Sequence, residues 1–148
     1  MKIIIAGGGE VGFHLAKLLS SESLDITLID SDKERLHYAE SHLDIRGLRG
    51  DAMSLSIMKE AKVANSDLFI AVTAEESINI TICAIAKQLG CKRTIARISN
   101  IELIKAQDII SFQDIGVDEL ISPEEIAAEE IQQLIDQSAF SNSYEFEG

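Results

Sequence analysis

Three glycines near the start of the chain have the spacing of a phosphate-binding turn. Gly7, Gly9 and Gly12 fit the pattern G-x-G-x-x-G, after an apolar run typical of a buried strand and before the apolar periodicity of a helix. Gly7 permits a tight turn, Gly9 lets a pyrophosphate approach the backbone because it has no Cβ, and Gly12 allows close packing of helix on strand. The N-terminus of that helix offers free N–H groups and partial positive charge, both suited to phosphate.

An acid follows at the distance that a ribose requires. Asp30 ends a second apolar strand, about 20 residues beyond the glycines. Its carboxylate can accept hydrogen bonds from the 2′- and 3′-hydroxyls and would repel a 2′-phosphate, so we expect NAD(H) to be preferred over NADP(H). A glycine-rich turn without any ligand is the alternative. The succession of strand, glycines, helix, strand and acid favours a dinucleotide site.

Further candidates follow the third, fourth and fifth predicted strands, where ligands bind in such sheets. Asp51 could bond the adenine or its surroundings, or it could only cap the third helix. Thr73, followed by Ala74, could bond a ribose or phosphate, or serve only as a turn residue at the helix entry. Arg97 could hold a phosphate or the far half of a dinucleotide, or form a structural ion pair. Asn79, one turn into the next helix, is expected to brace the loop.

The elements that must position these residues alternate between strand and helix. Short apolar runs mark strands that are covered on both faces, and we predict an α/β fold of the Rossmann type, with a doubly wound parallel sheet of six strands in the order 3-2-1-4-5-6. Ser31 and Ser122 are predicted to cap helices in capping boxes, and Gly90 to end the fourth helix. The expected strands are residues 2–6, 25–29, 44–48, 68–72, 94–98 and 119–121, and the expected helices are 9–20, 32–42, 52–61, 76–89, 101–110 and 123–137.

Composition excludes several classes of protein. An apolar fraction of 46% without any run of 18 apolar residues excludes a transmembrane or disordered chain. A formal net charge of −12 argues against nucleic acid as a partner, since phosphate neutralisation needs clustered Lys and Arg. The start lacks a signal-peptide cleavage site, so a cytoplasmic location is expected. Cys83 and Cys91 have the spacing of neither a zinc site nor a disulfide framework.

Catalytic equipment is missing from the places where an enzyme would need it. None of the three histidines follows a strand in the second half of the sheet, where a dehydrogenase acid or base would lie. The chain has no G-x-x-x-x-G-K-[ST] loop and no G-x-S-x-G elbow. We therefore predict a binding protein that is not an enzyme, in which bound nucleotide acts as a signal. The cofactor-binding fragment of an NAD-dependent oxidoreductase is the alternative.

Several segments resemble the potassium-transport nucleotide-binding domain, also called KTN or the N-lobe of RCK. They are residues 4–12, 28–30, 50–52, 71–73, 79, 95–97 and 116–123. The last of them, a Gly-Val-Asp-Glu-Leu-Ile-Ser-Pro segment before a long helix, is more specific than the glycines. The similarity covers residues 1–137, the expected nucleotide-binding domain. Because the family continues into a second small domain, residues 138–148 are expected to be a linker or the start of that missing domain.

The resemblance implies a ligand and its contacts. The domain would bind NAD(H), or ATP or ADP as related members do. By position, the nucleotide would contact Gly7, Gly8, Gly9, Glu10, Val11, Asp30, Thr73, Ala74 and Arg97, with Asp51 as a further contact.

The resemblance also implies partners. The domain would form a homodimer or a larger ring beneath a membrane potassium transporter or channel, as a peripheral subunit on the inner face of the cell membrane, and nucleotide exchange would gate ion flux. The last helix, residues 123–137 (Pro123 to Gln137), would cross to the neighbouring subunit. Packing of this helix on its own sheet is the alternative.

Overall fold

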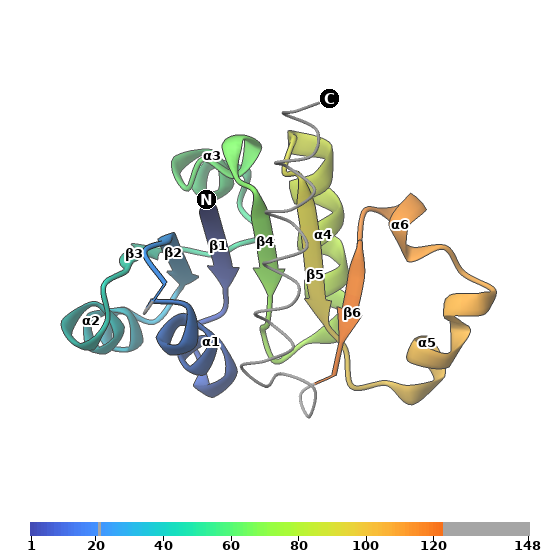
Figure 1. Cartoon of the computed structure of the whole chain (residues 1–148), viewed down its shortest axis with the longest axis horizontal. Helices are drawn as coiled ribbons and strands as arrows, with labels where there is room; N and C mark the ends of the chain where they lie inside the picture. The colour runs from blue at the N-terminus through green and yellow to red at the C-terminus, as the bar shows by residue number, and fades with distance from the viewer. Residues whose placement is uncertain (21, 123–148) are drawn as a thin grey trace.

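A single parallel sheet of six strands organises the molecule (Figure 1). The structure, a computed structural model, describes residues 1–20 and 22–122. The strand order is β3-β2-β1-β4-β5-β6, so the predicted fold class and strand order are confirmed. The strands are β1 (Lys2–Ala6), β2 (Asp25–Asp30), β3 (Arg46–Arg49), β4 (Leu68–Ala71), β5 (Arg93–Arg97) and β6 (Glu119–Ile121).

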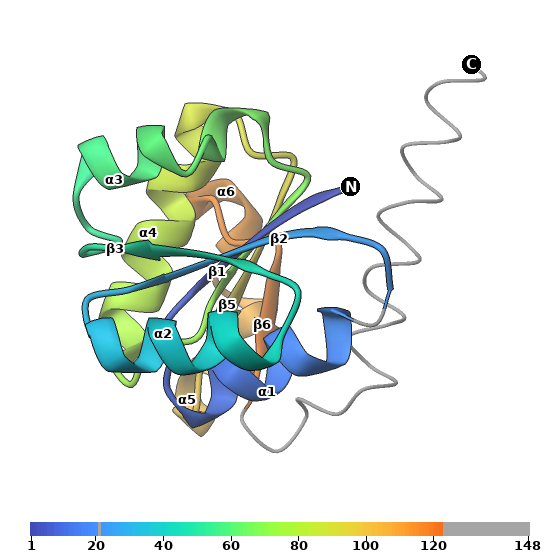
Figure 2. The same cartoon turned by 90° about the vertical axis from the view of Figure 1, so that its left-hand side faces the viewer.

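Helices cover both faces of the sheet, as Figure 2 shows edge-on. α1 and α2 lie on one face, and α3 and α4 on the other. The short helices α5 and α6 lie beyond β6, at the edge of the sheet (Figure 1). The helices are α1 (Glu10–Ser20), α2 (Lys33–His42), α3 (Leu55–Glu60), α4 (Glu76–Leu89), α5 (Ile101–Lys105) and α6 (Phe112–Ile115), with 3-10 turns η1 (Val63–Asn65) and η2 (Ala106–Asp108).

The core has two layers because successive side chains of a strand point to opposite faces. In β1, Ile3 and Ile5 pack with the leucines of α1, whereas Ile4 packs with Met58 of α3 and Ile82 of α4. All five side chains are fully buried. The central strands are therefore covered on both faces, as their continuous apolar runs predicted.

Capping residues set several helix starts differently from the prediction. α2 is capped by Asp32, not Ser31, because the Asp32 carboxylate accepts hydrogen bonds from the amides of Glu34 and Arg35. α3 begins at residue 55 rather than 52, since the Ser54 hydroxyl caps it. The predicted end of α4 is confirmed at Gly90, which takes a φ of +121°.

The segment between β5 and β6 is more broken than expected. The predicted helix over residues 101–110 ends at Lys105 and continues as the 3-10 turn η2. A further short helix, α6, was not predicted and is capped by Ser111. The predicted helix over residues 123–137, its capping box and the tail 138–148 lie outside the described residues. Within the described part of the chain, no helix has both the length and the apolarity to cross a membrane.

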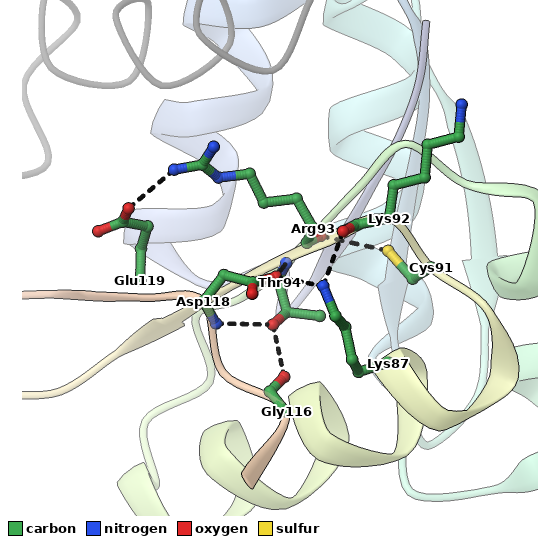
Figure 3. A network of polar contacts seen from close by, with 8 residues as sticks. All are labelled: Lys87, Cys91, Lys92, Arg93, Thr94, Gly116, Asp118 and Glu119. Atoms are coloured by element: carbon green, nitrogen blue, oxygen red, sulfur yellow. Dashed lines mark hydrogen bonds and ion pairs between the residues drawn. The ribbon is translucent and has the colours of Figure 1, made fainter. Parts of the chain in front are cut away.

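A polar cluster joins α4, β5 and β6 near the amino end of β5 (Figure 3). We call Lys87, Thr94, Gly116 and Asp118 the β5–β6 network. Lys87 Nζ lies 2.7 Å from Asp118 Oδ2, which also accepts a bond of 2.9 Å from the Thr94 amide. The Thr94 hydroxyl donates to the Gly116 carbonyl at 2.6 Å and lies 3.1 Å from the Asp118 amide. The network fastens the short edge strand β6 to the rest of the sheet.

Candidate functional site

A cleft of about 410 Å³ opens at the carboxyl ends of β1, β2, β4 and β5. This is the position at which the strand order reverses and at which open α/β sheets bind ligands. Every site residue predicted from the sequence lines this cleft: Gly7, Gly8, Gly9, Glu10, Val11, Asp30, Asp51, Thr73, Ala74 and Arg97.

The glycine turn owes its shape to contacts that only glycine allows. Gly7 has a φ of +115°, and a Cβ there would lie 3.0 Å from the Thr73 amide nitrogen. A Cβ at Gly12 would collide with the Gly7 carbonyl oxygen, so this glycine allows α1 to approach the turn itself. A Cβ at Gly9 would meet only Arg35 Nη1, 3.9 Å away, so this position is open. Gly7 and Gly12 are therefore required by the fold, whereas Gly9 leaves room for a ligand.

Asp30 is held by backbone amides at the end of β2. Its side chain is only 8% exposed. Oδ2 accepts a bond of 2.6 Å from the Gly8 amide, and Oδ1 accepts one of 2.8 Å from the Asp32 amide. Because a carboxylate has about four acceptor positions, each oxygen keeps capacity for another donor. The acid is thus oriented by the protein and still able to accept hydrogen bonds from a ligand.

Asn79 is a fully buried connector between the ends of β4 and β5. Its Oδ1 accepts bonds from the Thr73 amide (2.9 Å) and hydroxyl (2.6 Å). Its Nδ2 donates to the carbonyls of Thr73 (3.1 Å) and Arg97 (2.9 Å). The predicted bracing role of Asn79 is confirmed, and it fixes two cleft residues in relation to each other.

Arg97 reaches the same region from the end of β5. Its Nη1 donates to the Thr73 carbonyl at 3.3 Å, and it forms no ion pair with any carboxylate of residues 1–20 and 22–122. Glu76 accepts hydrogen bonds from the hydroxyl and amide of Ser99 and from the amide of Asn100. These bonds, with the charge of Arg97, lower the pKa of Glu76. Glu76 thereby holds the segment that directly follows Arg97.

Asp51 does not cap the third helix. Its Oδ1 accepts a bond of 2.9 Å from the Met53 amide, and its carbonyl accepts one from the Ser54 amide, so it closes the turn before the helix. The helix cap is Ser54. Asp51 is exposed on the wall of the cleft beside Gly50 and Ala52, which leaves it available to a ligand.

Among the lining residues that were not predicted from the sequence, two lie within helices. Arg35, in the first turn of α2, borders the cleft near Asp30, and Ile78, in the first turn of α4, contributes apolar surface. Both lie inside helices whose residues were considered only for their periodicity. A search for basic residues one turn into the helix that follows the acid would have found Arg35.

The chemistry of the cleft suits binding. Its charged lining residues are three carboxylates and two guanidiniums, and its lining includes no His, Cys or Lys. Burial raises the pKa of both cysteine thiols, Cys83 and Cys91, which lie in the core. In the part of the chain that the structure describes, no three His, Cys, Asp or Glu residues are grouped as metal ligands. The cleft thus offers backbone amides, acceptors for hydroxyls and cations for phosphates.

Known structures share this fold. The TrkA-N domain of the inner membrane protein ybaL from Escherichia coli is 19% identical, with a TM-score of 0.70 over 90% of this chain and 95% of that one. A GsuK channel structure is 22% identical, with a TM-score of 0.67 over 93% of this chain and 24% of that one. At these identities the similarity establishes the architecture only.

Sequence comparison establishes the family. The Trk system potassium uptake protein TrkA of Haemophilus influenzae is 40% identical over 137 residues, which are 91% of this chain and 30% of that protein. A TrkA homolog of Methanothermobacter thermautotrophicus is 34% identical over 135 residues, 91% of this chain and 60% of that protein. This chain therefore spans only part of the length of these relatives. Residues 3–123 match the TrkA-N domain, and the chain belongs to the TrkA-N domain family.

Proposed function

We propose that this domain binds NAD(H) or an adenine nucleotide in the cleft, and that the bound nucleotide regulates a membrane potassium transporter or channel. The observation that carries the proposal is the convergence of the glycine turn, Asp30, Thr73 and Arg97 on one cleft at the strand-order switch. As these groups are placed in the cleft, they could contact the phosphates, the ribose and the distal end of one dinucleotide.

The cleft suggests an orientation for the nucleotide. Phosphates would lie against residues 7–11 and the N-terminus of α1, where free amides and the helix dipole favour anions. The ribose hydroxyls would donate to Asp30, and the adenine would lie toward Gly50 and Asp51. The distal end, nicotinamide or further phosphate, would lie toward Thr73, Ala74 and Arg97. Both NAD(H) and ATP or ADP satisfy this arrangement.

The relatives support a role in potassium transport. Those at 34–40% identity are named Trk system potassium uptake proteins, and GsuK, a channel of the same fold, has been solved bound to NAD and to ADP. We propose that this domain is a regulatory subunit on the inner face of the cell membrane, which assembles as a homodimer or larger ring through residues 123–137. Its partner would be a potassium transporter or channel and not a nucleic acid.

Regulation in this proposal does not require catalysis. A nucleotide shifts a conformational equilibrium when it binds two states with different affinity. The cleft spans the junction between β1 and β4, so one ligand would contact both halves of the sheet. Exchange of one nucleotide for another would thereby change the relative position of the two halves of the sheet. The membrane partner would receive this change as the signal.

Calorimetric titration with NADH, NAD⁺, ADP and ATP tests the proposal. Asp30→Asn keeps the shape of the side chain but weakens its acceptors, and we expect NADH binding to weaken by about 1.5–3 kcal/mol, the scale for hydrogen bonds to a charged group. Asp25→Asn is the matched control, since this exposed acid lies at the other end of β2, 3.5 Å from Lys2. Unchanged affinity in Asp30→Asn, or no binding by the unaltered domain, would refute the proposed site. Sustained oxidation of NADH with added carbonyl compounds would instead support an oxidoreductase.

A further inference from the structure

Arg35 extends from the first turn of α2 over the rim of the cleft. Its Nη1 is the nearest atom to the open position at Gly9, and it lies 3.8 Å from Asp30 Oδ2. The side chain borders both the cleft and an adjoining hollow of about 420 Å³ beside α1 and α2. Arg35 is therefore placed between the expected phosphate position and the expected ribose position.

The Arg35 guanidinium forms only weak contacts within the protein. Its ion pairs with Asp30 and Asp32 are 3.8 Å and 3.7 Å long, which is beyond hydrogen-bond range. In the described part of the chain its side chain makes no other polar contact within hydrogen-bond range, and 57% of it is exposed. The pair with Asp32 is exposed on both sides, and such pairs contribute little to stability. The fold thus keeps a cation beside the cleft whose donors remain free.

A guanidinium with free donors next to a glycine turn suits a phosphate. Its five N–H groups form a planar fork that can bind two phosphate oxygens at once. Arg97 lies on the β5 side of the same cleft, so the two arginines line it from opposite halves of the sheet. The two nearby acids would keep Arg35 at the rim without using its donors.

We propose that Arg35 is a specificity-determining residue that binds a phosphate group on the adenosine half of the nucleotide. This inference rests on the function proposed above and adds a second phosphate-binding cation to the site. Two phosphates share the required chemistry: the pyrophosphate, and a 2′-phosphate on the ribose. For a 2′-phosphate, the charge of Arg35 would offset the repulsion expected from Asp30, and the cleft would then also accept NADP(H).

The test compares Arg35→Gln with Lys33→Gln, which removes the same charge from the same turn of α2 but lies outside the cleft. NADH and NADPH are titrated into each variant at low and at high sodium chloride, and circular dichroism verifies that the fold is retained. We expect Arg35→Gln to weaken the binding of NADPH, or of both NADH and NADPH, about tenfold at low salt, because a charge-assisted bond is lost. The difference should shrink at high salt, because exposed charges are screened.

The outcomes show which phosphate Arg35 binds, and they distinguish failure of the Arg35 role from failure of the proposed function. An equal loss for NADH and NADPH identifies the pyrophosphate, and a loss for NADPH alone identifies the 2′-phosphate. Binding by Arg35→Gln equal to that of the unaltered domain, or the same loss in Lys33→Gln, overturns the role of Arg35. If the unaltered domain binds neither probe, the proposed function itself fails.

Discussion

The cleft and the β5–β6 network are two polar regions at opposite ends of one sheet, and they use their polar groups differently. In the network, Lys87, Thr94 and Asp118 bond one another and the backbone at 2.6–3.1 Å, so their capacity is consumed within the fold (Figure 3). In the cleft, Arg35 has ion pairs no shorter than 3.7 Å, and Asp30 keeps spare acceptor positions.

The difference teaches how a binding region can be distinguished from a structural one. Both contain charged residues, and both join segments far apart in the sequence. Polar groups whose hydrogen bonds are all made within the protein contribute little to ligand affinity. Oriented groups with unused donors or acceptors form new hydrogen bonds when a ligand binds. By this criterion we expect a ligand to bind at the carboxyl end of the sheet, whereas the network fastens an edge strand.

The largest expected effect comes from the glycine turn. Gly12→Ala forces a Cβ into the Gly7 carbonyl, so we expect a loss of about 3 kcal/mol of stability, the upper range for overpacking, together with loss of nucleotide binding. Urea unfolding and calorimetry measure the two quantities. Gly9→Ala is the matched control: its Cβ enters open space, so stability should hold while affinity falls. Equal stability of the two variants would show that Gly12 is not needed for packing.

A smaller effect is expected in the β5–β6 network. Asp118→Asn removes the charge that faces Lys87, and both side chains are partly buried, so we expect about 1 kcal/mol of destabilisation with unchanged nucleotide affinity. Thermal unfolding and titration with NADH measure these changes. Asp108→Asn, in the 3-10 turn η2, serves as the surface control. A marked loss of affinity in folded Asp118→Asn would contradict the division between the two regions.

The smallest expected effect is on the stability of the fold at acid pH. The pKa of Glu76 is lowered in the folded state, so its contribution to stability is complete above the ordinary carboxyl pKa of 4.5 and is lost as pH falls through the lower, folded value. Glu76→Gln should therefore lower stability modestly in the neutral range and flatten its decline in acid, so that the two proteins converge at low pH. Chemical unfolding across an acid pH series measures the slope. An identical slope in both proteins would show that Glu76 gains nothing from its bonds to Ser99 and Asn100.

Much of the fold could be predicted because local signals agreed with tertiary packing. β1, α4 and β6 have the predicted bounds, and the α4 end follows from a glycine that alone tolerates a φ of +121° easily. The start of α3 was wrong because Asp51 and Ser54 form a capped turn ahead of the helix. α6 was missed because four residues are too short to show helical periodicity.

The candidate site residues that lie at the carboxyl ends of strands could be predicted from the sequence. Asp30 and Arg97 end their strands and Thr73 follows β4 by two residues, so topology alone brings them together. Arg35 was missed because its place over Gly9 depends on how α2 packs beside α1, which no local pattern encodes. The hydrogen bonds from the Gly8 and Asp32 amides to Asp30 were equally invisible, since they arise only after the turn has folded.

The Asn79 connector has a consequence for how the cleft responds to ionic strength. An uncharged amide with no exposed surface neither titrates nor interacts with mobile ions, so its grip on the ends of β4 and β5 is the same in dilute and concentrated electrolyte. A change in salt concentration would alter the contacts of the exposed Arg35 at the rim and leave the ends of β4 and β5 in place. The Asn79 bonds would thus keep Thr73 and Arg97 in the same relative position at any ionic strength.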